Sequence, residues 1–83
     1  MIWVAIDHYD AGQAVRNLVV DEHIVGGKRP GYGGGWVLRD SVHYWLMRRV
    51  QTYELTWSHV KHGYWHVGIE DPDVATLFKL TWS

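Results

Sequence analysis

The stretch that decides the fold is ELTWSHVKHGYWHVGIE, residues 54–70. Apolar and polar residues alternate on both sides of a segment that contains Gly63, a pattern typical of a β-hairpin. Two registers compete, a two-residue loop at His62-Gly63 and a three-residue loop at Lys61-His62-Gly63. The three-residue loop gathers the apolar side chains on one face, whereas the two-residue loop splits them. We therefore predict the three-residue loop, with Trp65 in the core and opposite His59.

The choice of register fixes which side chains share a face, because a slip of one residue moves every side chain to the other side of the sheet. With the three-residue loop, the core face carries Leu55, Trp57, His59, Trp65, Val67 and Ile69, and the opposite face carries Thr56, Ser58, Val60, Tyr64 and His66. The opposite face is then the more polar one.

The residues before the hairpin predict a strand and then a helix. Residues 2–6 are a run of apolar residues, which predicts a buried strand. The polar residues 7–10 that follow predict a turn. Asp10 can cap a helix, with Gln13 completing a capping box. Apolar residues then recur at intervals of three and four over residues 11–25, which predicts an amphipathic helix that ends at Gly26-Gly27.

Two further helices and a short strand are expected. Residues 36–38 predict a short strand. Asp40-Ser41 predicts the N-cap of a helix. Its apolar face holds Val42, Trp45, Leu46, Val50 and Tyr53. Asp71 caps a last helix with Pro72 at its first position. Its apolar face holds Val74, Leu77, Phe78 and Trp82, although the final residues also alternate and could unwind into an edge strand.

Length and composition limit the architecture. A chain of 83 residues with 47% apolar residues allows one domain, residues 1–83, with one core. The pattern of strands and helices predicts an α+β fold in which helices pack on one face of a short sheet that includes the hairpin.

Composition also excludes several classes of function. Eight Lys and Arg residues against nine Asp and Glu residues leave a net charge of −1, which is unlike a duplex-binding protein. The absence of cysteine excludes disulfide scaffolds and thiol nucleophiles. No apolar run reaches the ~18 residues that span a bilayer, so we expect a cytoplasmic protein with no membrane partner.

Histidines and aspartates suggest two metal sites, and for each site the same residues also have an ordinary structural explanation. His59, His62 and His66 could ligate zinc, but in the preferred register His59 and His66 point to opposite faces. Asp7, His8 and Asp10 follow a strand and could hold a magnesium ion, but we favour a helix cap at Asp10 and turn positions for Asp7 and His8, because no P-loop or serine nucleophile accompanies them. We expect no catalytic residue, no metal and no cofactor.

The glycine-rich segment from residue 26 to residue 35 is expected to be a mobile loop, because glycine offers little to bury. It contains Lys28, Arg29 and Tyr32, and Trp36 follows it. Cations with aromatic rings on a flexible backbone can hold single-stranded nucleic acid. A plain linker or a loop that contacts a protein is the alternative.

The aromatic content indicates a binding protein. Six Trp, five Tyr and one Phe are more rings than a domain of this size can cover in its own core. Exposed aromatic residues dominate protein interfaces, so we expect a partner protein or a second copy of the chain. The expected binding residues are Lys28, Arg29, Tyr32, Trp36, Tyr64 and His66.

The tail YWHVGIEDPDVATLFKLTW, residues 64–82, resembles the C-termini of short phage-encoded proteins of unassigned function. Those proteins run from an aromatic strand through an acidic turn into a stretch similar to ATLFKLTW. The resemblance covers about the last quarter of the chain and transfers no catalytic residue. It implies a viral accessory protein that occupies the surface of a host or defence protein, in the cytoplasm of the host cell.

These observations give three hypotheses in order. The first is a non-enzymatic protein, encoded by a phage, that binds another protein through exposed aromatic residues and the glycine-rich loop; inhibition of a host or defence protein would fit this hypothesis. The second is a single-stranded nucleic-acid binder that uses the segment from Lys28 to Trp36. The third is a metal-dependent enzyme at Asp7, His8 and Asp10.

Overall fold

The structure is a computed structural model that describes residues 1–7, 9–10, 13–14, 18–22, 29–33, 35–58 and 64–82. In chain order its elements are β1 (Ile2–Ile6), β2 (Tyr9–Asp10), β3 (Gln13–Ala14), β4 (Val19–Asp21), β5 (Gly31–Tyr32), β6 (Trp36–Leu38), α1 (Asp40–Met47), β7 (Glu54–Ser58), β8 (Tyr64–Ile69) and α2 (Pro72–Trp82). Strands and helices are both present, and the predicted α+β class is confirmed. Among the described residues, no helix is long and apolar enough to span a membrane.

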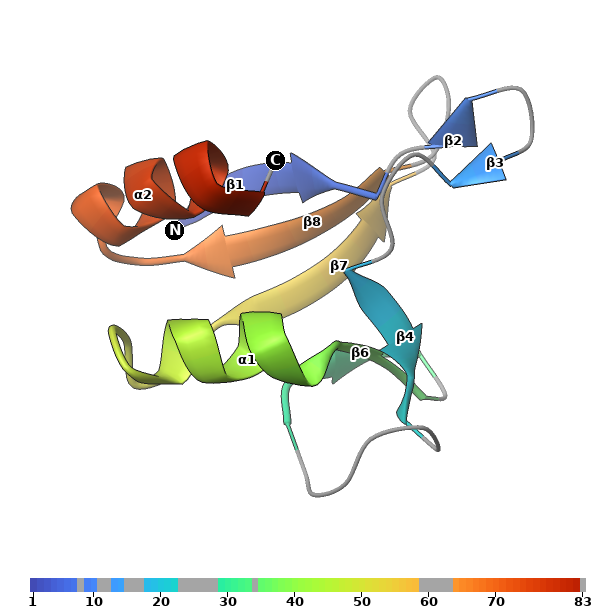
Figure 1. Cartoon of the computed structure of the whole chain (residues 1–83), viewed down its shortest axis with the longest axis horizontal. Helices are drawn as coiled ribbons and strands as arrows, with labels where there is room; N and C mark the ends of the chain where they lie inside the picture. Colours follow the sequence, from blue (N-terminus) through green and yellow to red (C-terminus); the bar gives the residue numbers. More distant parts are fainter. Residues whose placement is uncertain are drawn as a thin grey trace.

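The first three-stranded sheet has the order β1-β8-β7 and is antiparallel throughout (Figure 1). Val4 pairs with Val67, and Val67 pairs with Leu55, so these three residues form one row across the sheet. All three are buried. Because side chains alternate along a strand, the next row of three turns to the other side of the sheet.

The second three-stranded sheet has the order β4-β6-β5 and is also antiparallel. Strand β5 lies against β7, so the two sheets meet there. At the other end, the backbone N–H of Val19 in β4 donates to Oδ2 of Asp7, directly after β1, over 2.6 Å. The two sheets therefore share one core although they are not hydrogen-bonded as one sheet.

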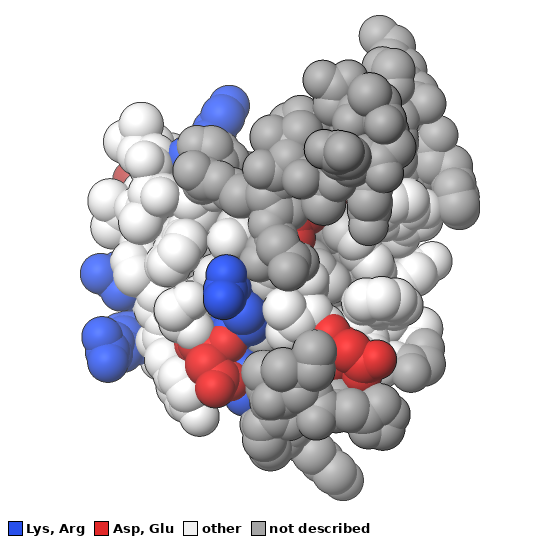
Figure 2. Space-filling model, turned by 45° about the vertical axis from the view of Figure 1, so that its right-hand side comes forward, with Lys and Arg blue, Asp and Glu red and all other residues white. Residues whose placement is uncertain are grey.

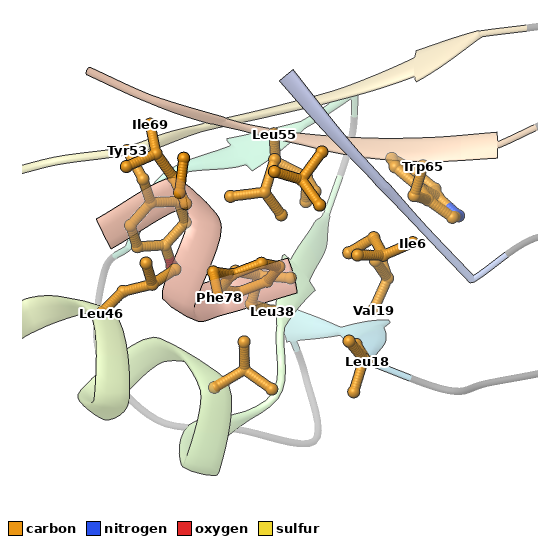
Figure 3. Close-up of a cluster of buried hydrophobic side chains, with 14 residues drawn as sticks. Ile6, Leu18, Val19, Leu38, Leu46, Tyr53, Leu55, Trp65, Ile69 and Phe78 are labelled. Carbon is orange, nitrogen blue, oxygen red and sulfur yellow. The ribbon is translucent and has the colours of Figure 1, made fainter. Parts of the chain in front are cut away.

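Both helices pack on the same face of the first sheet, as the sequence predicts. Val42 and Leu46 of α1 and Ala75 and Phe78 of α2 belong to one buried cluster with the inward side chains of both sheets (Figure 3). Trp45 of α1 joins the two helices, since its ring lies 5.8 Å from that of Phe78. In the described part of the chain, the opposite face of the first sheet carries no helix.

The predicted helix over residues 11–25 is wrong where the structure describes this segment, at residues 13–14 and 18–22; its other residues lie outside the described part of the chain. Asp10 pairs with Gln13 between β2 and β3 and does not begin a helix, and Val19–Asp21 form β4. Val19 and Val20 are β-branched and pair with Leu38 and Val37 of β6. The spacing of three and four in this segment is a local signal, and pairing with a distant strand overrides it.

The hairpin is confirmed, but its predicted loop register is wrong. Ser58 pairs with Tyr64 and Trp57 with Trp65, whereas a three-residue loop requires His59 opposite Trp65. The observed register places one Trp against another, with ring centroids 5.1 Å apart. The difference is two residues, an even number, so each described side chain keeps its predicted face. Residues 59–63 lie outside the described residues.

The glycine-rich segment contains a strand. Gly31–Tyr32 form β5, and Gly33 and Gly35 turn the chain into β6 with φ of 59° and 128°, values that favour glycine. The strand predicted at residues 36–38 is confirmed as β6. Residues 26–28 and 34 lie outside the described residues, and the mobility of the whole segment stays a prediction.

The two predicted helix starts differ in outcome. Helix α1 begins at Asp40 with Arg39 as its N-cap, and no side chain caps it, so a cap at Asp40-Ser41 is wrong. At α2 the prediction is confirmed, because Oδ1 of Asp71 accepts the backbone N–H of Asp73 over 2.9 Å. Helix α2 continues to Trp82, which excludes the edge-strand alternative.

The apolar face predicted for α2 is wrong at one residue, Leu77. Ala75 and Phe78 are its buried residues, and Leu77 is 44% exposed. Residue 77 lies about 100° around the helix from residue 78, so it turns away when residue 78 points into the core.

Candidate functional site

Four aromatic residues gather where the two sheets meet, and we call them the aromatic cluster: Tyr32, Trp36, Trp57 and Trp65. Trp65 of β8 lies at the centre. Its ring is 5.6 Å from that of Tyr32 in an edge-to-face arrangement and 6.0 Å from that of Trp36. The contact between β5 and β7 brings these rings together from four strands.

The aromatic cluster is buried at its centre and exposed at its rim. Trp65 is 8% exposed, whereas Tyr32 is 42% and Trp36 is 48% exposed. Edge-to-face contacts between rings favour fixed orientations. Trp65 therefore contacts two exposed rings, and its edge-to-face contact favours a fixed orientation for the ring of Tyr32, whereas the ring of Trp36 is tilted at 49° to it.

Arg29 has a different role from the one that the sequence suggests. Its side chain is 3% exposed, and its Nη1 lies 2.8 Å from Oδ1 of Asp40 and donates to the carbonyl oxygen of Leu38 over 3.2 Å. The guanidinium also lies 5.8 Å from the ring centre of Tyr44. Arg29 thus ties the glycine-rich segment to the start of α1. Lys28 lies outside the described residues.

The structure does not bring His66 to the aromatic cluster. His66 is next to Trp65 in β8, and neighbouring residues of a strand point to opposite faces. It pairs with Ala5 and Thr56 on the face away from the helices and is half-buried. The backbone of Tyr64 pairs with Ser58, and its side chain is not described.

The side chain of Asp7 has a structural role, because it accepts a backbone hydrogen bond. It is 5% exposed, has a φ of 46°, and accepts the N–H of Val19. Aspartate tolerates this left-handed conformation better than most residues. His8 and the side chain of Asp10 lie outside the described residues. Within the described part of the chain, no three His, Cys, Asp or Glu side chains are grouped to hold a metal ion.

The half-buried His43 and the buried Tyr53 form a polar pair that the sequence does not reveal. Nδ1 of His43 and the hydroxyl of Tyr53 share a hydrogen bond of 2.8 Å that connects α1 to the start of β7. Burial raises the pKa of Tyr53, because the phenolate is poorly solvated there. Burial, and then the Arg29 guanidinium, lower the pKa of His43. Both shifts favour the neutral form of the group, which suits a structural hydrogen bond.

Sequence reasoning finds the exposed rings of the aromatic cluster and misses their support. It predicts Tyr32 and Trp36 as binding residues or as part of a binding segment, but it assigns Trp57 and Trp65 only to the core. The signal is present in the hairpin, where each strand carries a Trp on its apolar face.

Comparison with known proteins finds no family model, curated protein or solved structure that matches this chain.

Proposed function

We propose that this chain is a non-enzymatic binding protein that engages another protein through the exposed rings of Tyr32 and Trp36. The observation that carries the proposal is the contact of both rings with the buried ring of Trp65. Rigid, half-exposed aromatic side chains are the residues that contribute most to the energy of protein interfaces. Because both rings already contact Trp65, we expect less conformational entropy to be lost on binding.

The charges of the molecule favour a protein over a single-stranded nucleic acid. A phosphate backbone needs several accessible cations, and the guanidinium of Arg29 is engaged by Asp40. On the face drawn in Figure 2, small groups of both signs lie among uncharged residues. With a net charge of −1, the chain has no general attraction for a polyanion.

The interior polar groups support a binding role over catalysis. Asp7 bonds to the backbone, and His43 and Tyr53 bond to each other. A general acid or base needs a pKa near the working pH, and burial moves the pKa of Tyr53 further from it.

The resemblance of the tail to phage-encoded proteins adds a proposed setting. In that setting the partner is a host or defence protein in the host cytoplasm, and occupying its surface inhibits it. A second copy of this chain is the alternative partner, since the same exposed rings can bury each other.

The proposal is tested by affinity capture from bacterial lysate, with and without nuclease. The baits are the wild-type chain, the double variant Tyr32→Ser with Trp36→Ser, and Tyr44→Ser, which removes a ring that is 54% exposed on α1. We expect the wild type and the α1 control to retain the same protein after nuclease treatment, and the double variant to lose it. Capture that disappears with nuclease, or that survives in the double variant, contradicts the proposal. Light scattering of the purified chain tests self-association.

A further inference from the structure

We infer that the chain has a second binding site, on the face of the first sheet that carries no helix in the described part of the chain, and that this site takes the arginine or lysine side chain of a basic peptide. The site consists of the indole of Trp3 and the carboxylate of Glu54, which border one cleft. It shares no residue with the aromatic cluster, although Gly31 and Thr56 of the cleft lining are sequence neighbours of Tyr32 and Trp57.

The first element of the site is the position of Trp3 over a glycine. Trp3 pairs with Gly68, and a Cβ at Gly68 would lie 2.8 and 2.9 Å from two carbons of the indole ring. Such distances are too short for real side chains, so only glycine lets the ring approach the backbone of β8. Met1 also contacts this position. Trp3 nevertheless remains 45% exposed.

The second element is the carboxylate in the same row of the sheet. Gly68 pairs with Trp3 on one side and with Glu54 on the other. Because Gly68 has no side chain, nothing from β8 stands between the indole and the carboxylate. Glu54 is exposed, and in the part of the chain that the structure describes it forms no ion pair.

The third element is a cleft of about 330 Å³ between this row and the start of β5. Pro30 and Gly31 form one wall, and Thr56 extends the floor along β7. Arg29, which precedes Pro30, points its guanidinium at Asp40 and the carbonyl of Leu38. Arg49, five residues before Glu54, donates to the carbonyl oxygen of Trp45 over 2.9 Å. Both therefore leave the carboxylate of Glu54 available to a cation from outside.

The chemistry of the lining selects the ligand. An indole attracts a guanidinium or ammonium group to its face, and a carboxylate accepts hydrogen bonds from the same group. The ring of Pro30, which lines the cleft, suits the methylene stem that arginine and lysine carry behind their charge. An anionic peptide is repelled by Glu54, and a neutral apolar peptide leaves that carboxylate desolvated and unpaired.

The test is an NMR titration of the full chain with an acetylated, amidated tetra-arginine peptide. Tetraglutamate and tetraproline peptides serve as matched controls. We expect saturable shifts of the Trp3 indole N–H and the Gly68 amide with tetra-arginine alone. Glu54→Gln should weaken binding about tenfold, the size of one charge-assisted hydrogen bond, and Trp3→Leu should weaken it comparably.

Two further variants test whether the peptide binds at Trp3 and Glu54 and not elsewhere on the surface. Glu70→Gln removes an exposed carboxylate away from the cleft and should bind as the wild type does. The double variant at Tyr32 and Trp36 should also bind normally, which keeps this inference separate from the proposed function. The inference is overturned if no peptide binds, if tetraproline binds as well as tetra-arginine, or if Glu54→Gln binds as tightly as the wild type. Because Glu54 is exposed and Gln has the same shape, that variant is expected to fold.

Discussion

Replacing Trp65 with alanine should be among the most damaging changes to this fold. Trp65 is 8% exposed and contacts the rings of Tyr32, Trp36 and Trp57. A Trp side chain buries up to about 250 Å². At 92% burial about 230 Å² leaves water, which corresponds to about 6 kcal/mol as an upper bound. The usual cost of Trp→Ala in a core is about 3–5 kcal/mol, and the loss of three ring contacts places Trp65 at the upper end.

Trp3 provides the matched control, because it is the same residue type at 45% exposure. About 140 Å² of the Trp3 side chain is buried, which corresponds to an upper bound of about 3.5 kcal/mol on the free energy that its burial contributes. Trp65→Ala should therefore cost about 2 kcal/mol more than Trp3→Ala. At about 0.05–0.15 kcal/mol per residue, a domain of this length has about 4–12 kcal/mol in total, so Trp65→Ala can abolish folding outright.

Urea unfolding followed by far-UV circular dichroism measures these differences, provided that the m-values agree. Trp65→Phe keeps a ring at the centre of the aromatic cluster and should fold with an intermediate loss of stability. Equal losses for Trp65→Ala and Trp3→Ala would refute the assignment of Trp65 to the core.

Four further changes test other parts of the structure. Asp7→Ala should lower the free energy of unfolding by about 1–3 kcal/mol, because the N–H of Val19 loses its acceptor. Gly31→Ala should also destabilise the chain in urea, since its Cβ would lie 2.8 Å from the carbonyl oxygen of Trp36. Asp71→Ala should cost about 1 kcal/mol through the lost cap of α2. The pKa of His43 is lowered in the folded state, so its contribution to stability is present above the ordinary pKa of 6.5 and is lost as the pH falls through and below that value. His43→Gln should reduce the fall in stability on acidification, as urea melts at several pH values will measure.

Each of these changes has a control or a contradicting result. Asp7→Asn keeps the acceptor and the left-handed backbone, and it should be milder than Asp7→Ala. If Gly31→Ala melts with the wild type, β5 does not pair as described. Asp71→Ser should restore most of the cap. An unchanged pH dependence in His43→Gln would assign the acid sensitivity to other groups.

Local signals predict the elements whose structure is decided locally. Alternation, helical spacing and, at α2, the Asp71 cap predict the strand at residues 2–6, the strand at residues 36–38, both strands of the hairpin and the two helices. Helix α1 nevertheless ends at Met47, before Val50 and Tyr53, which its predicted apolar face included. The predicted helix over residues 11–25 is wrong because β4 takes its structure from pairing with β6, a contact that periodicity does not register. The loop register is wrong because the pattern of apolar residues fixes only the face of each side chain, and the observed pairing of Trp57 with Trp65, two residues from the predicted register, leaves those faces unchanged.

The residues of the candidate sites also divide into those that the sequence predicts and those that only the structure shows. Tyr32 and Trp36 are identified from residue type alone. The Arg29–Asp40 ion pair is not, because nothing in the sequence says which way a long side chain turns. The row of Trp3, Gly68 and Glu54 joins three strands from different parts of the chain, and only the strand order reveals it. A glycine in the middle of an apolar strand is the one available signal, since it often marks a close approach.

The pairing of β1 with β8 has a consequence for how the chain acquires its structure during synthesis. β1 is made first, and its only hydrogen-bonded neighbour in the described sheet, β8, comes near the other end of the sequence (Figure 1). Translation adds about 5–20 residues per second, so the apolar residues of β1 wait for several seconds beside the ribosome without a partner. An unpaired apolar strand is a template for aggregation. Yield in cells should therefore depend on chaperones that shield nascent chains, and a silent slowing of codons between β1 and β8 should lower the soluble yield without changing one amino acid.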